Sequence, residues 1–449
     1  MKGTKPFPFQ REIVDQMKGR DLLALEMGLG KTFTALLRAK ECPDVRPVVA
    51  VCPASVKFVW EREAWVRCGL RAAVLEGRKP ERGIGKFPLY IVNYDILGDW
   101  LEWLKNLNPQ MVIGDEIQAI KNKGAQRSKA FRKLCQGVPS LVFLSGTPLI
   151  SRPAELFNAA NLLWPKEFSS FFSYAKEFCA PKRTYWGWDV SGAANLDILH
   201  RRLIRCGMQR RKKWQVLSEL PAKQRNVVPL PLSNPKEYEE AKKDFVGWLR
   251  KQSPQKAKRA EKAKALAQMG YLKRLAASLK LPAVLDWVDS FLDSTDEKLV
   301  LFAIHKTVVE ALRERYQNSV VLDGSTAPKD RQAAVDRFQR DDKCRLFIGN
   351  VQAAGVGITL TAAKTVAFAE MGWTPAEMMQ AEDRCHRIGQ TEQVSVYYLV
   401  AKDTIEAKLC ELLTKKSLIL DKTLDGKKGK QAELDIHKEL LKELSKEGK

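Results

Sequence analysis

Several features that define common protein classes are missing from this 449-residue sequence. No apolar run approaches the roughly 18 residues that a membrane-spanning helix needs. The opening residues, MKGTKPFPFQ, lack the apolar core of a secretory signal. We therefore expect the protein to stay in the compartment where it is made.

Clusters of cysteine and histidine are also missing. The nine cysteines are scattered singly from Cys42 to Cys410 without a C-x-x-C pair, and only four histidines occur. This pattern indicates neither a zinc site nor a disulfide framework, and it fits a reducing compartment. It gives no support to a nuclease either.

Acidic residues are few relative to basic ones. Lysine and arginine number 76 against 53 aspartates and glutamates, which gives a formal net charge of +23. Such a positive field attracts polyanions, so nucleic acid is the favoured class of partner. The length exceeds what one hydrophobic core usually organises, so we expect two or three compact units.

Short apolar runs alternate with helical stretches in two parts of the chain, which predicts two α/β lobes built on parallel sheets. The runs include LLAL, VVAVC and MVIGDE in the first part, and KLVLFAI, CRLFIGN and VSVYYLV in the second. We predict an N-terminal lobe at 1–230, with a helical protrusion at about 165–215, and a C-terminal lobe at 281–424. Residues 231–280 would form a basic helical protrusion or linker, and residues 425–449 a linker and C-terminal helix. The basic residues at 257–267 would lie either over phosphates or on a solvated helix.

The strongest motif is Glu26-Met-Gly-Leu-Gly-Lys-Thr32, which lies between an apolar strand and a helical stretch. Glycines at Gly28 and Gly30 permit backbone N–H groups to approach a phosphate closely. Lys31 would then meet the β- and γ-phosphates, and the Thr32 hydroxyl would hold Mg²⁺. The alternative interpretation is a tight turn between a strand and a helix.

A pair of carboxylates ends the apolar strand Met111-Val-Ile-Gly-Asp-Glu116. Hydrolysis of a nucleotide needs one carboxylate for the metal and another for the attacking water, so we assign Asp115 to Mg²⁺ and Glu116 to the water. Taken alone, such a pair is more typical of an ordinary loop at a strand end.

Two arginines are three positions apart in Gln380-Ala-Glu-Asp-Arg-Cys-His-Arg387, so we expect Arg384 and Arg387 to share a helix face. Their guanidinium groups could stabilise charge on a γ-phosphate if the two lobes close on one another. A surface helix with salt bridges is the alternative.

The order of these motifs resembles the Swi/Snf-type branch of superfamily-two helicase-like ATPases, from about Phe9 to Gly426. Further matches are Cys52-Pro-Ala-Ser55 with Trp60 and Glu63 as a strand-contact motif, Ile91–Tyr94, Ile120–Asn122, Leu144–Leu149, Asp323–Thr326, Ala353–Ala363 and His386–Gln390. A more specific likeness to the annealing-helicase subgroup lies in Phe178–Arg183, Trp186–Gly192, Arg210-Arg211 and Leu220–Arg225.

The resemblance implies two RecA-like parallel-sheet lobes with inserted helical protrusions, which use ATP and Mg²⁺ on duplex or branched DNA. The catalytic residues would be Lys31, Asp115, Glu116, Arg384 and Arg387, with Thr32 and Asp115 holding Mg²⁺. The nucleotide would contact Phe9, Gln10, Met27, Gly28, Leu29, Gly30, Lys31, Thr32, Gly357 and Gln380, with Phe9 and Gln10 at the adenine. The DNA would contact Ser55, Asn93, Lys121, Thr147, Ser325, Gly355 and Trp373.

Taken singly, most of these DNA-contact residues are also typical of turns and helix caps. A tryptophan such as Trp373 is more often part of a core than a ligand contact. The basic and aromatic segment Lys182–Trp188 is a surface candidate for which DNA contact and packing within the protrusion are equally good interpretations.

We therefore predict an ATP-driven translocase on duplex DNA, with a strand-separating DNA or RNA helicase as the alternative. A nucleotide-regulated clamp would be expected to lack Glu116 or the two arginines, and a small-molecule kinase would leave the second lobe unexplained. We expect a monomeric motor, cytoplasmic in a bacterial or virus-encoded setting, or nuclear if the source is eukaryotic.

Overall fold

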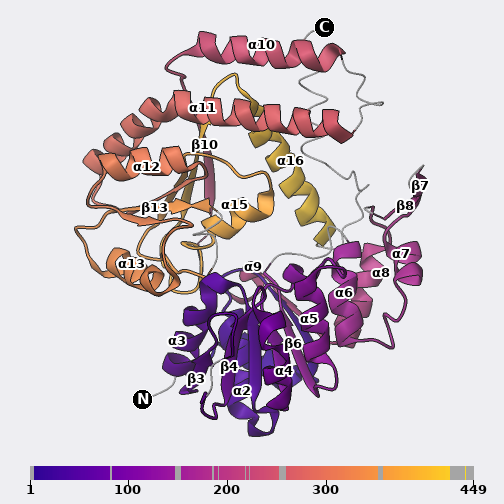
Figure 1. The fold of residues 1–449 in the computed structure, drawn as a ribbon. Helices are drawn as coiled ribbons and strands as arrows, with labels where there is room; N and C mark the ends of the chain where they lie inside the picture. The colour runs from indigo at the N-terminus through magenta and orange to yellow at the C-terminus, as the bar shows by residue number, and fades with distance from the viewer. Residues whose placement is uncertain are drawn as a thin grey trace. The chain divides into compact units, whose positions relative to one another are not determined.

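The computed structural model describes residues 5–80, 83–146, 153–184, 187–190, 192–217, 219–221, 223–251, 259–351, 357–424 and 440. The chain divides into two compact units, with the boundary between Glu219 and Leu220 (Figure 1). Among the described residues, no helix has the length and apolar content that crossing a lipid bilayer requires.

A seven-stranded sheet forms the centre of the first unit, and all of its strand pairs are parallel. In spatial order the strands are β3 (Ala72–Val74), β4 (Leu89–Asn93), β2 (Val48–Cys52), β5 (Met111–Gly114), β6 (Ser140–Leu144), β1 (Arg20–Leu25) and β9 (Met208–Arg211). Parallel pairing brings the carboxyl ends of all these strands to one edge, where β6 lies between β1 and β5. The segments that follow β1 and β5 therefore emerge close together.

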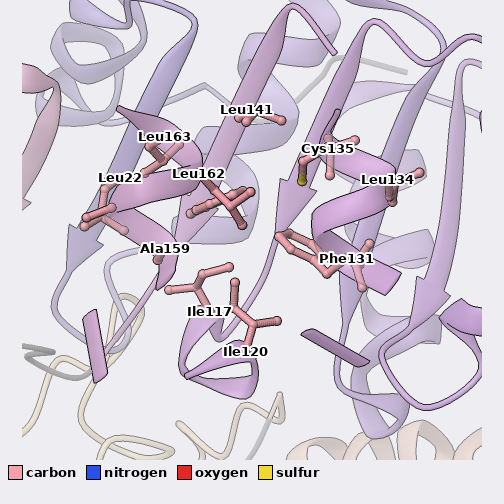
Figure 2. Packing of buried hydrophobic residues seen from close by; sticks show 14 of the residues in the cluster. Leu22, Ile117, Ile120, Phe131, Leu134, Cys135, Leu141, Ala159, Leu162 and Leu163 are labelled. Carbon is pink, nitrogen blue, oxygen red and sulfur yellow. The ribbon is translucent and has the colours of Figure 1, made fainter. Parts of the chain in front are cut away.

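Helices cover the faces of this sheet and bury its apolar strands. They are α1 (Pro8–Gln16), α2 (Lys31–Glu41), α3 (Lys57–Cys68), α4 (Leu97–Asn106), α5 (Gln126–Cys135) and α6 (Pro153–Leu163), with short 3-10 turns η1 (Pro43–Val45), η2 (Ala54–Val56) and η3 (Ile117–Ile120). Figure 2 shows part of the core, where Leu22 of β1 lies beside Leu162 and Leu163 of α6, and Phe131 of α5 belongs to the same cluster. Each such side chain contributes about 1.5–3 kcal/mol when fully buried.

The predicted protrusion of the first lobe contains α7 (Phe171–Phe178), the antiparallel hairpin of β7 (Lys182–Thr184) and β8 (Gly187–Asp189), and α8 (Leu196–Cys206). In Figure 1 these elements lie side by side at one border of the first unit. After α8 the chain returns to the main sheet as β9, and the short helix α9 (Lys213–Val216) follows. The inserted part is thus shorter than the 165–215 that the sequence indicated, because β9 pairs with β1.

The second unit is built on a six-stranded parallel sheet. Its strands in spatial order are β10 (Gln224–Leu230), β15 (Ser395–Ala401), β14 (Thr365–Phe368), β11 (Leu299–Ala303), β13 (Leu346–Asn350) and β12 (Val320–Leu322). The helices are α10 (Pro235–Lys251), α11 (Arg259–Ser294), α12 (Lys306–Arg315), α13 (Pro328–Arg340), α15 (Pro375–Glu382) and α16 (Ile405–Leu424). Two parallel α/β lobes with inserted helices confirm the predicted fold class.

Two segments differ from the domain limits that the sequence suggested. Residues 224–230 were placed at the end of the first lobe, but they form β10, which pairs with β15 of the second sheet along its whole length. The 231–280 segment was expected to end before the second lobe, but α11 continues through that limit to Ser294. Apolar residues of α11, such as Leu272 and Val288, are buried in the cores of the second unit, so this helix packs on the lobe as well as carrying charge.

Candidate nucleotide-binding site

The glycine-rich loop connects β1 to α2 and has the backbone that a phosphate-binding loop needs. Gly28 and Gly30 have φ angles of 85° and 74°, in a region of backbone conformation that residues other than glycine rarely adopt. Gly30 is also the residue before α2, and a β-carbon there would lie 2.7 Å from Nε2 of Gln10. The loop therefore presents Leu29, Gly30 and the first amides of α2 where an anion is favoured.

Gln10 holds this loop from the side of α1. Its side chain is only 1% exposed. Oε1 accepts a hydrogen bond from the backbone N–H of Phe7 (3.0 Å), and Nε2 donates to the carbonyl of Leu29 (3.0 Å). Phe9 is buried next to it and stacks on Phe7 with ring centroids 6.0 Å apart. The structure thus brings the predicted adenine element into direct contact with the glycine-rich loop.

Lys31 begins α2, and its side chain folds back over the loop. Its Nζ donates to the carbonyl of Leu25 at 3.2 Å. A β-carbon built on Gly146, which follows β6, would lie 2.8 Å from this Nζ and 2.7 Å from Cε of Met27. Thr32 follows in the first turn of α2 and is half-buried. Gly146 therefore leaves room for the Lys31 and Met27 side chains, which a β-carbon at this position would crowd.

The acidic pair follows β5 at the same sheet edge, and its first carboxylate is held by several groups. Asp115 is buried, and its Oδ2 accepts a hydrogen bond from the indole Nε1 of Trp60 (2.9 Å). Its Oδ1 accepts from the backbone N–H of Glu116 (2.9 Å), and the Tyr94 hydroxyl donates to its backbone carbonyl (2.7 Å). The carboxylate is therefore fixed in orientation before any ligand arrives.

Burial and the neighbouring Glu116 raise the pKa of Asp115 to about 6, while the Trp60 hydrogen bond and the charge of Lys31 act in the opposite direction. Because Lys31 lowers that pKa, the ammonium of one motif and the carboxylate of the other lie close enough to interact. Glu116 has a left-handed backbone with φ 47°, and its Oε2 accepts from Nε2 of Gln118 at 2.5 Å. The first unit thus gathers a lysine, two carboxylates and a helix N-terminus at one edge.

Trp60, which the sequence analysis counted within a strand-contact motif, supports the acidic pair in this structure. Its side chain is 1% exposed and points to Asp115, so it has no surface to offer a nucleic acid. Glu63 of the same motif pairs with Arg67 at 2.7 Å. Trp60 and Tyr94 therefore support the acidic pair, a role that the sequence analysis did not assign to them. Their presence in the matched motifs was the one sequence feature that pointed to these two residues.

In the second unit, the arginine motif is not one helix. The sequence predicted that Arg384 and Arg387 share a helix face, but α15 ends at Glu382 and the following residues form turns. The two side chains still converge, because Nη1 of each donates to the carbonyl of Ile358, at 3.4 Å and 3.0 Å. Arg384 Nε also donates to the carbonyl of Gln380 (3.1 Å). Gln380 is thus bonded to Arg384, and Gly357 directly precedes Ile358, the acceptor of both arginines. These four predicted site residues, Gly357, Gln380, Arg384 and Arg387, lie together in the second unit.

The residues predicted to contact DNA follow carboxyl ends of parallel strands where the structure describes them, which is where open α/β sheets bind ligands. Thr147 and Gly355 lie outside the described residues. Three of the described members belong to the first unit: Ser55 in η2, the buried Asn93 at the end of β4, and Lys121 after η3, whose Nζ lies 3.3 Å from Glu155. The other two belong to the second unit. Ser325 follows β12 and lies beside Asp323, and Trp373 follows β14 with Nζ of Lys273 over its ring.

Comparison with known proteins gives two family matches that adjoin each other. The SNF2-related domain matches residues 13–280, and the helicase conserved C-terminal domain matches residues 280–389. The chain is 35% identical to the mouse protein "DNA annealing helicase and endonuclease ZRANB3" over 97% of this chain and 42% of that protein. It is 34% identical to the Xenopus tropicalis "SWI/SNF-related matrix-associated actin-dependent regulator of chromatin subfamily A-like protein 1" over 93% and 45%.

The chain spans less than half the length of these two relatives. Among solved structures, the "Sulfolobus solfataricus SWI2/SNF2 ATPase core in complex with dsDNA" matches with a TM-score of 0.44 and 23% identity, covering 94% of this chain and 95% of that one. The SNF2-related match alone covers more than half of the sequence. The predicted resemblance is thus confirmed, and the chain belongs to the SNF2-related, Swi/Snf-type family of helicase-like ATPases.

Proposed function

We propose that this chain is an ATP-dependent double-stranded DNA translocase of the Swi/Snf type, which moves along or remodels duplex or branched DNA and can anneal it. One observation carries the proposal: Lys31 and the pair Asp115–Glu116 meet at one edge of a single sheet, with the Lys31 charge acting on Asp115. A positive charge beside a buried carboxylate, next to a helix N-terminus, is what nucleotide hydrolysis needs.

Each site residue of the first unit has a role in this proposal. Lys31 and the amides of the glycine-rich loop would bind the β- and γ-phosphates, and Glu116 would polarise the attacking water. The hydroxyl of Thr32 and the carboxylate of Asp115 are hard oxygen donors and fit Mg²⁺, which when bound neutralises phosphate charge. Phe9 and Gln10 would hold the adenine beside the remaining loop residues, Met27, Leu29 and Gly30.

The second unit would supply Arg384 and Arg387, which keep their charge at any physiological pH and suit the charge that develops on a transferred phosphoryl group. Gly357 and Gln380 would complete this part of the nucleotide site. Their common neighbour, the carbonyl of Ile358, accepts from both arginines and so sets the two guanidinium groups side by side.

Three points support DNA as the polymer on which the motor acts. The net charge of +23 favours a polyanion. The mouse relative carries the name of a DNA annealing helicase. The contacts that we propose, Ser55, Asn93, Lys121, Thr147, Ser325, Gly355 and Trp373, are mostly small polar or basic groups, which suit a phosphate backbone without reading sequence.

The hairpin of β7 and β8 is a further DNA contact in this proposal. Arg183 and Trp188 are directly opposite each other in the antiparallel register, so their side chains share one face. Trp188 is 62% exposed, which favours surface contact over packing within the protrusion. A guanidinium beside an exposed indole suits stacking on a base and pairing with a phosphate.

The cellular location and oligomeric state of the motor complete the proposal. The relatives compared above come from animals, so they give no support to the bacterial or virus-encoded source that the sequence analysis expected. We propose that the protein acts where the genome lies, in the nucleus of a eukaryote or the cytoplasm of a cell without one, and that it works as a monomer.

The test is steady-state ATP hydrolysis with no nucleic acid, linear duplex, single strand, forked DNA and RNA. Duplex or forked DNA should stimulate hydrolysis most, and Glu116→Gln should still bind a fluorescent ATP analogue while losing this turnover. Displacement of a third strand from a DNA triplex should occur without separation of a duplex. Equal stimulation by RNA, or duplex separation, would replace the translocase with a strand-separating helicase, and no stimulation at all would favour a clamp.

A further inference from the structure

A buried polar cluster surrounds Glu382, the last residue of α15 and the second residue before Arg384. The Glu382 side chain is 0% exposed, and both of its oxygens are used. Oε2 accepts from Nζ of Lys223 (2.7 Å) and from Nη2 of Arg225 (2.7 Å). Oε1 accepts from Nε of Arg225 (3.0 Å) and from the hydroxyl of Tyr398 (2.5 Å).

The contacts continue on both sides of Arg384. Nζ of Lys223 also donates to Oδ1 of Asp383 at 2.8 Å. His386, which lies between the two arginines in sequence, bonds through Nε2 to the carbonyl of Pro221 at 2.8 Å. Asp383 and His386 are themselves buried. Three residues of the arginine motif are thus bonded to Pro221, Lys223 and Arg225, which lie within one short segment of chain, 221–225.

That segment has a special place in the sequence. Leu220 is the first residue of the second unit, so residues 221–225 are where the connection from the first unit enters the second. Gln224 and Arg225 begin β10, the edge strand of the second sheet. The segment is therefore held by strand pairing on one side and by the arginine motif on the other.

Such a cluster is costly unless every charge is compensated. Removing Glu382, Asp383 and most of Lys223 from water costs several kcal/mol per ion, which close pairing and further hydrogen bonds must offset, whereas the Arg225 side chain stays 44% exposed. Here burial acts to raise the pKa of Glu382, but Lys223 and Arg225 outweigh it and hold that pKa below its usual value. The pairing is thus strong enough to keep this carboxylate charged inside the unit.

The backbone that carries the two arginines has little other regular support. After α15 ends at Glu382, residues 383–389 form turns rather than helix or strand. The guanidinium groups depend on this backbone to reach their shared acceptor, the carbonyl of Ile358. A cluster that fixes residues 382, 383 and 386 therefore also fixes the backbone positions from which the Arg384 and Arg387 side chains extend.

We propose that Glu382, Asp383 and His386, together with Lys223 and Arg225, form a latch that positions Arg384 and Arg387 by tying the turn that carries them to the segment entering the second unit. These are positioning residues, since they act through the arginines. The inference rests on the proposed function for the arginines' catalytic role, but the latch itself is a property of the fold. A disturbance of residues 221–225 is transmitted to both arginines.

A matched control exists in the same unit. The Lys280 side chain is 2% exposed, against 11% for Lys223, and its Nζ donates to Oε2 of Glu406 (2.5 Å) and to the carbonyl of Leu399 (2.6 Å). This pair connects α11 to the start of α16 and has no bond to the arginine turn. Lys280→Met therefore breaks a buried Lys–Glu pair of the same kind without touching the latch.

The experiment compares Lys223→Met, Lys223→Arg and Lys280→Met in the full chain by hydrogen exchange and by ATP hydrolysis. Lys223→Met should speed amide exchange at residues 383–389, and Lys280→Met should leave those amides unchanged. With DNA present, Lys223→Met should lower kcat by about tenfold with KM for ATP within about twofold, and Lys223→Arg should restore most of it.

Hydrogen exchange separates the two hypotheses, because it needs no activity. Faster exchange at residues 383–389 in Lys223→Met, in a protein that does not hydrolyse ATP, would leave the latch standing and remove the proposed function. Unchanged exchange in Lys223→Met would overturn the latch. Equal loss of kcat in Lys223→Met and Lys280→Met, in proportion to lost stability, would also overturn it.

Discussion

The Lys31 ammonium occupies the space beside Gly146, so that a β-carbon at residue 146 would lie 2.8 Å from its Nζ. Gly146 follows β6, the strand between those that carry the glycine-rich loop and the acidic pair. The absence of a side chain at this position is therefore part of the nucleotide site, although Gly146 supplies no functional group.

Gly146→Ala should impair catalysis while leaving the fold intact. The atoms in the way are Nζ of Lys31 and Cε and Cγ of Met27. These flexible side chains can move aside at small cost to stability, but the movement takes the lysine away from the phosphates. We expect the melting temperature to change little and kcat/KM for ATP to fall by about tenfold or more. Gly98→Ala in α4, where nothing lies within 4 Å, is the control. Equal activity in the two variants would show that Lys31 does not need this space.

Trp60→Phe should weaken Mg²⁺ use without changing the sheet around it. The variant keeps the ring in its buried position but removes the donor to Oδ2 of Asp115. Loss of a group that orients a metal ligand typically costs about 10–100-fold in metal affinity, so the Mg²⁺ concentration for half-maximal ATP hydrolysis should rise by at least about tenfold.

Tyr94→Phe is the matched comparison, because the Tyr94 hydroxyl bonds to the backbone carbonyl of Asp115 and not to its carboxylate. It should cost about 1 kcal/mol of stability with little change in the Mg²⁺ requirement. If both variants shift the Mg²⁺ requirement equally, the Trp60 contact has no special role at the metal.

The parts of the site that could be predicted from sequence are local. Lys31 and Thr32 follow glycines between a strand and a helix, and Asp115 follows an apolar strand, so their neighbours along the chain define them. That both motifs lie at one edge follows from parallel pairing. The presence of β6 between β1 and β5, which brings Gly146 to Lys31, depends on strand order, and no local pattern encodes that order.

The parts that could not be predicted depend on contacts between distant residues. Trp60 reaches Asp115 across 55 positions and Lys223 reaches Glu382 across 159, so neither partner signals the other in the sequence. Lys280 was counted in a basic helical protrusion or linker, but its charge is buried against Glu406 in the second unit. The three-residue spacing of Arg384 and Arg387 suggested a helix, yet α15 ends before them and the two side chains converge through Ile358 instead.

Trp188→Ala should weaken binding to DNA that offers unpaired bases. If the exposed indole stacks on a base, its removal costs about 1–3 kcal/mol, or roughly tenfold in affinity for forked or single-stranded oligonucleotides measured by fluorescence anisotropy. Trp188→Phe keeps a stacking surface and should retain most of the affinity. Identical affinities for all three proteins would assign the hairpin to another role.

The charge state of Glu382 gives a prediction about acid stability. Burial opposes its ionisation, but Lys223 and Arg225 hold the pKa of Glu382 below its ordinary value of 4.5. A carboxylate whose pKa is lower in the folded state stabilises the protein above the unfolded value. That contribution is lost as the pH falls through the lower pKa of the folded state, because the unfolded chain binds its proton first.

Glu382→Gln should therefore flatten the dependence of stability on acid pH. Between the two pKa values one extra proton binds to the unfolded chain, which gives a slope of up to about 1.4 kcal/mol per pH unit in the free energy of unfolding. Urea denaturation on both sides of pH 4.5 should show this slope reduced in Glu382→Gln and unchanged in Glu102→Gln, whose side chain is 80% exposed. The slope is the diagnostic quantity, since the glutamine leaves Lys223 and Arg225 undercompensated and lowers stability at every pH. If Glu382→Gln shifts the whole curve down without changing its slope, the pKa of Glu382 is the same in the folded and unfolded states, and the cations around it do not lower it.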